Sequence, residues 1–135
     1  MITAVDTSVL LDIFGADRKF GPGSAAALNT CLTKGSLVAC DVVWAETCAA
    51  FATPASAESA MTLLRIDFSP TNSTIALAVG EAWRAYRRAG GTRERVIADF
   101  MIGAHALASA DWLLTRDRGF YRRYFKGLQV MPSLD

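Results

Sequence analysis

The sequence predicts an α/β protein in which a central parallel sheet is covered by helices on both faces. Short apolar runs alternate with longer segments of helical character along the chain, which is the pattern of the β-α units that build parallel sheets. The short runs are apolar almost throughout, as strands buried on both faces are. We expect residues 1–135 to form a single domain, which is long enough to bury a core without disulfides.

The first strand ends at Asp6. Residues 1–5 form a short apolar run that stops at Asp6-Thr7-Ser8, and a second apolar run follows at once. We expect Thr7 or Ser8 to cap the helix that begins there. Open α/β sheets bind ligands at the carboxyl ends of their strands, so the Asp6 carboxylate is expected in the functional crevice. Asp12, further along this helix, is expected to be an ordinary solvated residue.

The next elements follow from their boundary residues. Pro22 opens a helix over residues 23–34, and Gly35 ends it, as proline and glycine commonly do at helix termini. Residues 36–40 form a second short buried strand.

A pair of helices and a weak third strand complete the first half of the chain. Asp41 is placed to cap a helix over residues 42–52, and Thr53-Pro54 begins another that runs to about residue 65. Residues 66–68 form the weak strand, which Ser69-Pro70 interrupts.

The second half of the chain repeats the alternation. Residues 72–89 carry apolar side chains at helical spacing, and residues 95–109 form a helix that is apolar apart from Asp99 and His105. Further strands are predicted at residues 112–115 and 128–131, and the aromatic and basic run of residues 120–126 is expected to anchor the last of them.

Composition restricts the class of protein. No apolar run approaches the roughly 20 residues that span a bilayer, and the chain enters a strand without a leader-like segment. We therefore expect a soluble, cytoplasmic protein that makes no membrane contact. Cys31, Cys40 and Cys48 are odd in number and lie in apolar surroundings, so buried free thiols are expected and not a disulfide framework or a zinc site.

Charge is divided unevenly along the chain. Residues 84–126 contain ten basic and four acidic side chains, a balance of +6, whereas the remaining residues sum to −5. The alternative is a set of scattered solvated arginines. The asymmetry favours a surface that faces a polyanion such as RNA.

Four carboxylates stand alone in apolar segments. They are Asp6, Glu46, Asp99 and Asp117. Each has a plain structural alternative: a cap, a turn residue or the partner of a buried arginine. Because an isolated buried carboxylate is costly, convergence of all four on one divalent cation explains them better as a set. Oxygen ligands select Mg²⁺ or Mn²⁺, and the natural chemistry of such a centre is hydrolysis of a phosphodiester.

Several other residues receive structural interpretations. The side chains three, four and seven positions after Asp99 include the small residues Gly103 and Ala106, which would let their helix approach the sheet closely. His105, the only histidine, is expected to be a satisfied core residue. The tryptophans Trp44, Trp83 and Trp112 are expected in the core.

Four stretches carry a family resemblance. They are Val5-Asp6-Thr7-Ser8, Val43-Trp44-Ala45-Glu46, residues 98–106 (ADFMIGAHA) and residues 113–121 (LLTRDRGFY). Together they closely resemble the PIN-domain ribonucleases, in particular the VapC-type toxins of bacterial type II toxin–antitoxin pairs. The resemblance extends from the first strand to the last, and it is most specific over residues 93–125.

The resemblance implies a three-layer α/β sandwich, a Mg²⁺- or Mn²⁺-dependent endoribonuclease and a cognate antitoxin that occupies or distorts the active site. It places Asp6, Glu46, Asp99 and Asp117 on the family's acidic positions, and Ser8 and Thr115 on supporting hydroxyl positions. A homodimer is the expected assembly. RNA contacts are expected from three arginines: Arg93, Arg116 and Arg118.

Rival interpretations fit less well. A response-regulator receiver domain needs adjacent acids after the first strand, where only Asp6 is found, and a haloacid-dehalogenase-like phosphatase needs an aspartate where this chain has Ser8. A catalytically inactive PIN-like module that binds RNA or a partner is the alternative from a different class.

Overall fold

The computed structural model describes residues 1–92 and 95–131, which form five strands and seven helices. The strands are β1 (Ile2–Val5), β2 (Ser36–Ala39), β3 (Ile66–Phe68), β4 (Trp112–Leu114) and β5 (Gln129–Met131). The helices are α1 (Thr7–Phe14), α2 (Gly21–Lys34), α3 (Asp41–Cys48), α4 (Pro54–Leu63), α5 (Ser73–Arg88), α6 (Ile97–Ser109) and α7 (Arg118–Tyr124). The strands make one sheet in the order β3-β2-β1-β4-β5, and every pairing is parallel.

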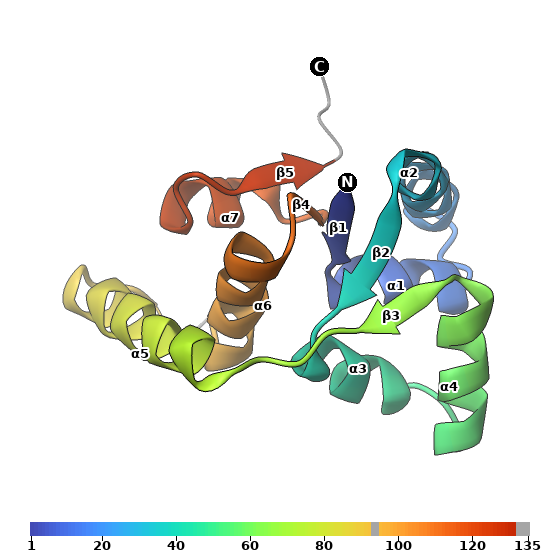
Figure 1. Cartoon of the computed structure of the whole chain (residues 1–135), viewed down its shortest axis with the longest axis horizontal. Helices are drawn as coiled ribbons and strands as arrows, with labels where there is room; N and C mark the ends of the chain where they lie inside the picture. The colour runs from blue at the N-terminus through green and yellow to red at the C-terminus, as the bar shows by residue number, and fades with distance from the viewer. Residues whose placement is uncertain (93–94, 132–135) are drawn as a thin grey trace.

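Helices cover the sheet on two sides. The chain moves from β1 outward to β3 and then crosses back to β4 and β5, so right-handed connections place the two sets of helices on opposite faces. Figure 1 shows α5, α6 and α7 gathered on one side of the strands, with α1, α2 and α4 on the other. The predicted three-layer α/β fold with a parallel sheet is confirmed.

The order of the strands creates a switch point between β1 and β4. β1 pairs with β2 on one side and with β4 on the other, and the connections leave β1 and β4 in opposite directions. Open parallel sheets bind ligands at the carboxyl edge of such a point. Asp6 follows β1 and Thr115 follows β4, so both residues lie at this edge.

A cluster of aromatic rings holds α5, α6 and α7 together. Phe100 of α6 is fully buried, and its ring lies 5.3 Å from the rings of Trp83 and Phe120 and 5.2 Å from Tyr86. Tyr124 meets Tyr86 at 5.3 Å, which brings α7 against α5. Trp44 and Trp83 pack against the core, as expected of these tryptophans.

Gly103 of α6 makes room for a ring and not for the sheet. A Cβ atom at this position would lie 2.5 Å from the Phe125 ring, and Phe125 is buried. The expectation of a small-residue face on α6 is therefore right, but the neighbour that occupies the space is the chain just after α7.

Several element boundaries differ from those predicted. Neither Thr7 nor Ser8 caps α1, because both hydroxyl groups bond to carboxylates instead. Asp41 does not cap α3; its carboxylate accepts hydrogen bonds from the backbone and hydroxyl of Thr71 at 3.3 and 2.8 Å. Thr53 does cap α4, through a 3.1 Å bond from the Ser56 amide.

Two further differences concern the extent of helices. α3 ends at Cys48, four residues earlier than expected, because residues 49–51 continue in tighter turns that bring the Phe51 ring within 5.2 Å of Phe14. The aromatic and basic run after β4 forms a helix, α7, which the sequence interpretation left unassigned.

The three cysteines and the helices can be compared with what the sequence predicts for disulfides and membrane spans. Cys31, Cys40 and Cys48 are free, and Cys48 is half-buried where full burial was expected. Among residues 1–92 and 95–131, no helix combines the length and the apolar character needed to cross a membrane.

Candidate active site

Asp6 lies at the centre of the site. Its backbone N–H donates to the Leu114 carbonyl at 2.9 Å, which extends the pairing of β1 with β4 by one residue. The side chain is buried, with 7% of the residue exposed. The Thr115 hydroxyl donates to Asp6 Oδ2 at 2.6 Å, and the Ser8 hydroxyl lies 3.5 Å from the same oxygen. The two supporting hydroxyls predicted from the sequence therefore both face Asp6.

The electrostatic surroundings of Asp6 oppose its ionisation. Burial raises the pKa of Asp6 from 3.8 to about 6, although the hydrogen bond from Thr115 lowers it. The negative charges of Asp99 and Glu46 raise this pKa further. Two of the other predicted acids thus act on Asp6 through space, and a nearby cation would relieve this repulsion.

Glu46 is held towards Asp6 by a threonine. It lies on α3, which contacts both α1 and α6, and its Oε1 accepts a hydrogen bond of 2.8 Å from the Thr7 hydroxyl. Thr7 follows Asp6 directly in the chain. Sequence reasoning missed this role because Thr7 also fits the pattern of a helix cap.

Asp99 stabilises the N-terminus of α6 through a hydrogen bond, in addition to any catalytic role. It lies in the first turn of α6, where its Oδ2 accepts a hydrogen bond of 3.2 Å from the Val96 amide. This bond satisfies one of the amides that a helix N-terminus leaves without an internal partner. The side chain is half-buried.

Asp117 is turned towards an arginine. Its Oδ2 forms an ion pair and hydrogen bond with Arg95, and its backbone N–H donates to the Thr115 hydroxyl at 3.0 Å. The Arg95 guanidinium also lies 4.1 Å from the centre of the Phe120 ring. Arg95 was not singled out from the sequence, where nothing links it to Asp117 22 residues away.

Tyr121 is a buried aromatic residue close to the acids. It is 1% exposed and packs against Phe120 and Phe125, in agreement with the predicted anchoring role. Burial raises the pKa of its phenol, and the charges of Asp6, Asp99 and Asp117 raise it further. The phenol is therefore a neutral group close to the acids.

The four acids do not form a closed metal cage. Within residues 1–92 and 95–131, no three or more His, Cys, Asp or Glu side chains are gathered tightly enough to hold an ion. The negative charges of Asp99 and Glu46 act on Asp6, whereas Asp117 pairs with Arg95. The donors are oxygen atoms of carboxylates and hydroxyls, a set that fits a hard cation such as Mg²⁺ or Mn²⁺.

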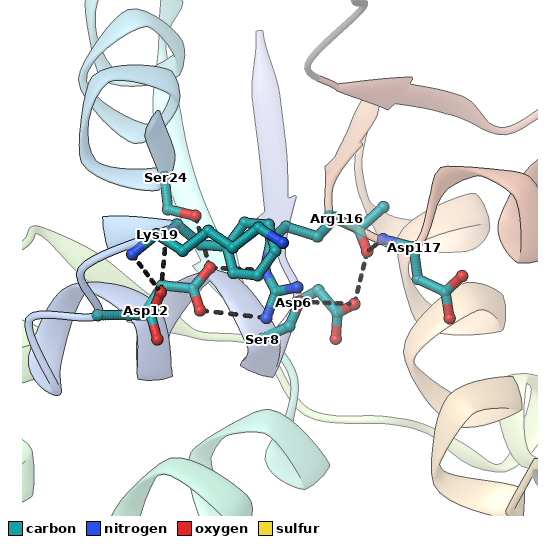
Figure 2. A network of polar contacts seen from close by, with 10 residues as sticks. Asp6, Ser8, Asp12, Lys19, Ser24, Arg116 and Asp117 are labelled. Carbon is teal, nitrogen blue, oxygen red and sulfur yellow. Dashed lines mark hydrogen bonds and ion pairs between the residues drawn. The ribbon is translucent and has the colours of Figure 1, made fainter. Parts of the chain in front are cut away.

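Asp12 is not solvated, which corrects the expectation for this residue. It is 5% exposed, and its carboxylate accepts hydrogen bonds from Arg116 Nε at 2.7 Å, Arg116 Nη2 at 3.1 Å and the Ser24 hydroxyl at 2.7 Å. The Arg116 guanidinium also lies 4.0 Å from the centre of the Phe20 ring. Figure 2 shows Arg116 reaching from the side of Asp117 across to Asp12 and Ser24.

The three arginines expected to contact RNA differ in their positions. Arg116 has Asp12 as its partner. Arg118 begins α7 and, with Arg116, lines a largely apolar cleft of about 710 Å³ between α2 and the end of β4. Arg93 lies outside the described residues.

His105 is separate from this site. It is 1% exposed, and its Nε2 lies 2.9 Å from the Ser69 hydroxyl. Burial lowers the pKa of His105. These observations agree with the interpretation of His105 as a core residue.

Comparison with known proteins supplies the family. The PIN domain family matches residues 3–126, whereas no curated protein sequence matches the chain. Among solved structures, VapBC-1 of nontypeable Haemophilus influenzae is similar with 20% identity and a TM-score of 0.72, covering 96% of each chain. VapBC2 of Rickettsia felis, bound to a promoter DNA fragment, has 17% identity and a TM-score of 0.71 over 96% of this chain and 97% of its own.

A third structure extends this set of similar folds. FitAcB of Neisseria gonorrhoeae is 19% identical, with a TM-score of 0.67 over 98% of this chain and 97% of its own. Identities at this level show a common fold. The match over residues 3–126, together with the acids at the carboxyl edge of a five-stranded parallel sheet, shows that the chain belongs to the PIN domain family.

Proposed function

We propose that the chain is a Mg²⁺- or Mn²⁺-dependent endoribonuclease that acts as the toxin of a VapC-type toxin–antitoxin pair. The observation that carries the proposal is the environment of Asp6. This carboxylate is buried at the switch point, and the charges of Asp99 and Glu46 oppose its ionisation. Divalent cations are the partners that such groups of acids most often bind.

Each residue of the site has a distinct task in this proposal. Asp6, Asp99 and Glu46 would hold the ion, and Asp117 would act at the outer side of the centre. The chemistry that the ion supplies is hydrolysis of a phosphodiester by an activated water. Thr115 fixes one oxygen of Asp6 and the backbone of Asp117, so the acids keep their positions when substrate arrives.

The partner is proposed from the similar structures. Those structures are VapBC and FitAB complexes, several of them bound to DNA, and this supports a cognate antitoxin for the present chain. A homodimer, a cytoplasmic location and RNA as the substrate complete the proposal.

The alternative is a PIN-like module that binds RNA or a partner without cutting. The pairing of Asp117 with Arg95 and the lack of a gathered group of three acids among the described residues favour this alternative. The two functions differ in whether RNA is cleaved.

An RNA-cleavage assay distinguishes the nuclease from the inactive binding module. The chain, freed of antitoxin, is incubated with labelled single-stranded and structured RNA. We expect cleavage with Mg²⁺ or Mn²⁺ and none with EDTA. Asp6→Asn and Asp99→Asn should each reduce it more than about 100-fold, beyond the losses typical of residues that only support a ligand. Asp67→Asn is the matched control, because Asp67 is exposed on β3.

The outcomes assign the function. Cleavage that survives EDTA and both substitutions would refute the metal-dependent mechanism. RNA binding without cleavage under any metal would establish the inactive module. Growth arrest on expression of the chain alone, relieved by Asp6→Asn, is the corresponding test of the toxin assignment.

A further inference from the structure

Three consecutive residues after β4 are each tied to a different part of the fold. Thr115 donates to Asp6 at 2.6 Å, Arg116 bonds to Asp12 at 2.7 and 3.1 Å, and Asp117 pairs with Arg95. The anchors lie after β1, within α1 and before α6 respectively. The position of this turn relative to Asp6 therefore depends on three separate contacts.

The contact of Arg116 with Asp12 is built as a buried anchor. Side-chain exposure is 39% for Arg116 but only 7% for Asp12, so the acid end of the pair is withdrawn from water. Arg116 uses Nε and Nη2 together, the bidentate arrangement that fixes orientation as well as distance. The Ser24 hydroxyl bonds to the same Oδ2 of Asp12, which ties α2 into the contact.

We propose that Arg116 and Asp12 are positioning residues that fix the turn of residues 115–117, and that Arg116 does not contact the RNA backbone. The proposal rests on the endoribonuclease function proposed above. Held by Asp12, the turn keeps the Thr115 hydroxyl on Asp6 Oδ2 and the Asp117 amide on Thr115. The pair thus acts on the acids through Thr115.

The geometry disfavours Arg116 as a phosphate ligand. The edge of the guanidinium formed by Nε and Nη2 would suit a phosphate, but Asp12 occupies it. One face of the group lies over the Phe20 ring. Binding of RNA there would leave the Asp12 carboxylate buried without its cation, which is strongly unfavourable.

Two substitutions separate positioning from RNA binding. Asp12→Asn removes the pair but keeps the Arg116 charge, whereas Arg116→Gln removes both. Positioning predicts that each lowers kcat by about 10- to 100-fold with little change in KM, as losses of residues that orient ligands do. The double variant should be no worse than either single one, since the residues act as a unit.

Binding of RNA by Arg116 predicts a different pattern. Arg116→Gln would raise KM and weaken RNA affinity, while Asp12→Asn would leave both unchanged or improve them. That pattern would overturn the proposal, as would full kcat in both variants. Arg116→Lys serves as a milder variant: it retains charge without the bidentate fork, and intermediate kcat is expected.

Hydrogen exchange of the Asp117 amide gives a readout that does not need activity. This amide donates to the Thr115 hydroxyl, so Asp12→Asn should accelerate its exchange if the pair fixes the turn. The Ile75 amide, which donates to Asn72 on α5, is the control and should be unaffected. Unchanged exchange at Asp117 would refute positioning. Equal acceleration at both amides would show general destabilisation and would also refute it.

The two proposals can fail separately. If the wild-type chain does not cleave RNA, the function is wrong, yet faster exchange at Asp117 alone still supports the anchor. If the wild-type chain cleaves RNA and Asp12→Asn leaves kcat and the exchange unchanged, the anchor is wrong and the function stands.

Discussion

At the scale of single residues, Asp6 combines a functional position with an energetic cost. Its carboxylate is buried, and the negative charges of Asp99 and Glu46 act on it. A folded-state pKa of about 6 in place of 3.8 corresponds to about 3 kcal/mol of lost stability when the group is ionised. Functional groups commonly retain such costs because the site needs them.

The sign of the pH dependence follows from this shift. Because the pKa of Asp6 is higher in the folded state, its protonation favours folding. The contribution is fully present below about pH 4 and is lost as pH rises through about 6. We therefore expect Asp6→Asn to stabilise the metal-free protein by about 1–3 kcal/mol at pH 8, and to have little effect at pH 4.

Urea unfolding in EDTA at the two pH values measures this difference. Asp67→Asn, on an exposed position of β3, should show no comparable gain. A stabilisation of Asp6→Asn that is equal at pH 4 and pH 8 would contradict the assigned cause. Addition of Mg²⁺ at pH 8 should stabilise the wild-type protein more than Asp6→Asn, because only a folded site binds the ion.

At the scale of secondary-structure elements, α6 links the site to the aromatic core. Asp99 lies in its first turn, and Gly103 lies one turn later against the Phe125 ring. The close approach of α6 to the chain after α7 depends on the missing side chain at Gly103. The placement of Asp99 is therefore coupled to packing that lies outside the site.

Gly103→Ala and Gly80→Ala test this coupling as a matched pair within helices. A Cβ at Gly103 would lie 2.5 Å from Phe125, whereas one at Gly80 meets nothing within 4 Å. We expect Gly103→Ala to destabilise the fold by about 1–3 kcal/mol through overpacking. Gly80→Ala should stabilise it by about 0.5–1 kcal/mol, because alanine favours a helix.

The denaturant midpoints of Gly103→Ala and Gly80→Ala, compared with that of the wild-type protein, measure these changes in stability. Nuclease activity provides a second measurement. Gly103→Ala is expected to lose activity as well, since α6 carries Asp99. A shift of the same sign and size in both variants would show that only helix propensity is involved.

The elements also show what the sequence could and could not predict. Apolar patterning was sufficient for the strands, the parallel sheet and the place of Asp6, because these depend on local periodicity and on the order of elements. The missed helix α7 carried a readable signal: Phe120, Tyr121, Tyr124 and Phe125 have the spacing of one helical face. The basic residues between them obscured it.

Long-range pairing accounts for the remaining errors. Asp12 was expected in solvent because its partner Arg116 lies 104 residues away, and Arg95 was missed because its link to Asp117 spans 22 residues. Thr7 satisfied a capping pattern although its hydroxyl bonds to Glu46. Residue types and spacings do not determine which of two available partners a polar side chain takes.

At the scale of the whole molecule, much of the excess of basic residues in the second half of the chain lies on two neighbouring helices, α5 and α7. The Tyr86 and Tyr124 rings bring α5 and α7 together, and five of the arginines on these two helices are exposed. They are Arg84, Arg87 and Arg88 on α5 and Arg122 and Arg123 on α7. Arg95 and Arg116, by contrast, are paired with acids.

RNA affinity in EDTA, measured across a range of salt concentrations, tests this surface. Each arginine that contacts a phosphate should lower the slope of log affinity against log salt by about 0.7 when it is replaced, as for single strands. We expect this for Arg122→Gln and Arg123→Gln. Lys34→Gln, the same change of charge at the end of α2, is the control, and an equal effect there would indicate only nonspecific attraction.

The central position of β1 in the sheet has a consequence during synthesis of the protein on the ribosome. The two strands that flank β1 in the sheet lie far apart from each other in the chain. β2 follows soon after β1, whereas β4 begins at Trp112. Thr115, which secures Asp6, is synthesised 109 residues after it. On the proposed activity, a nascent polypeptide therefore remains harmless until translation has passed residue 117, and interrupted synthesis releases fragments that lack part of the catalytic centre.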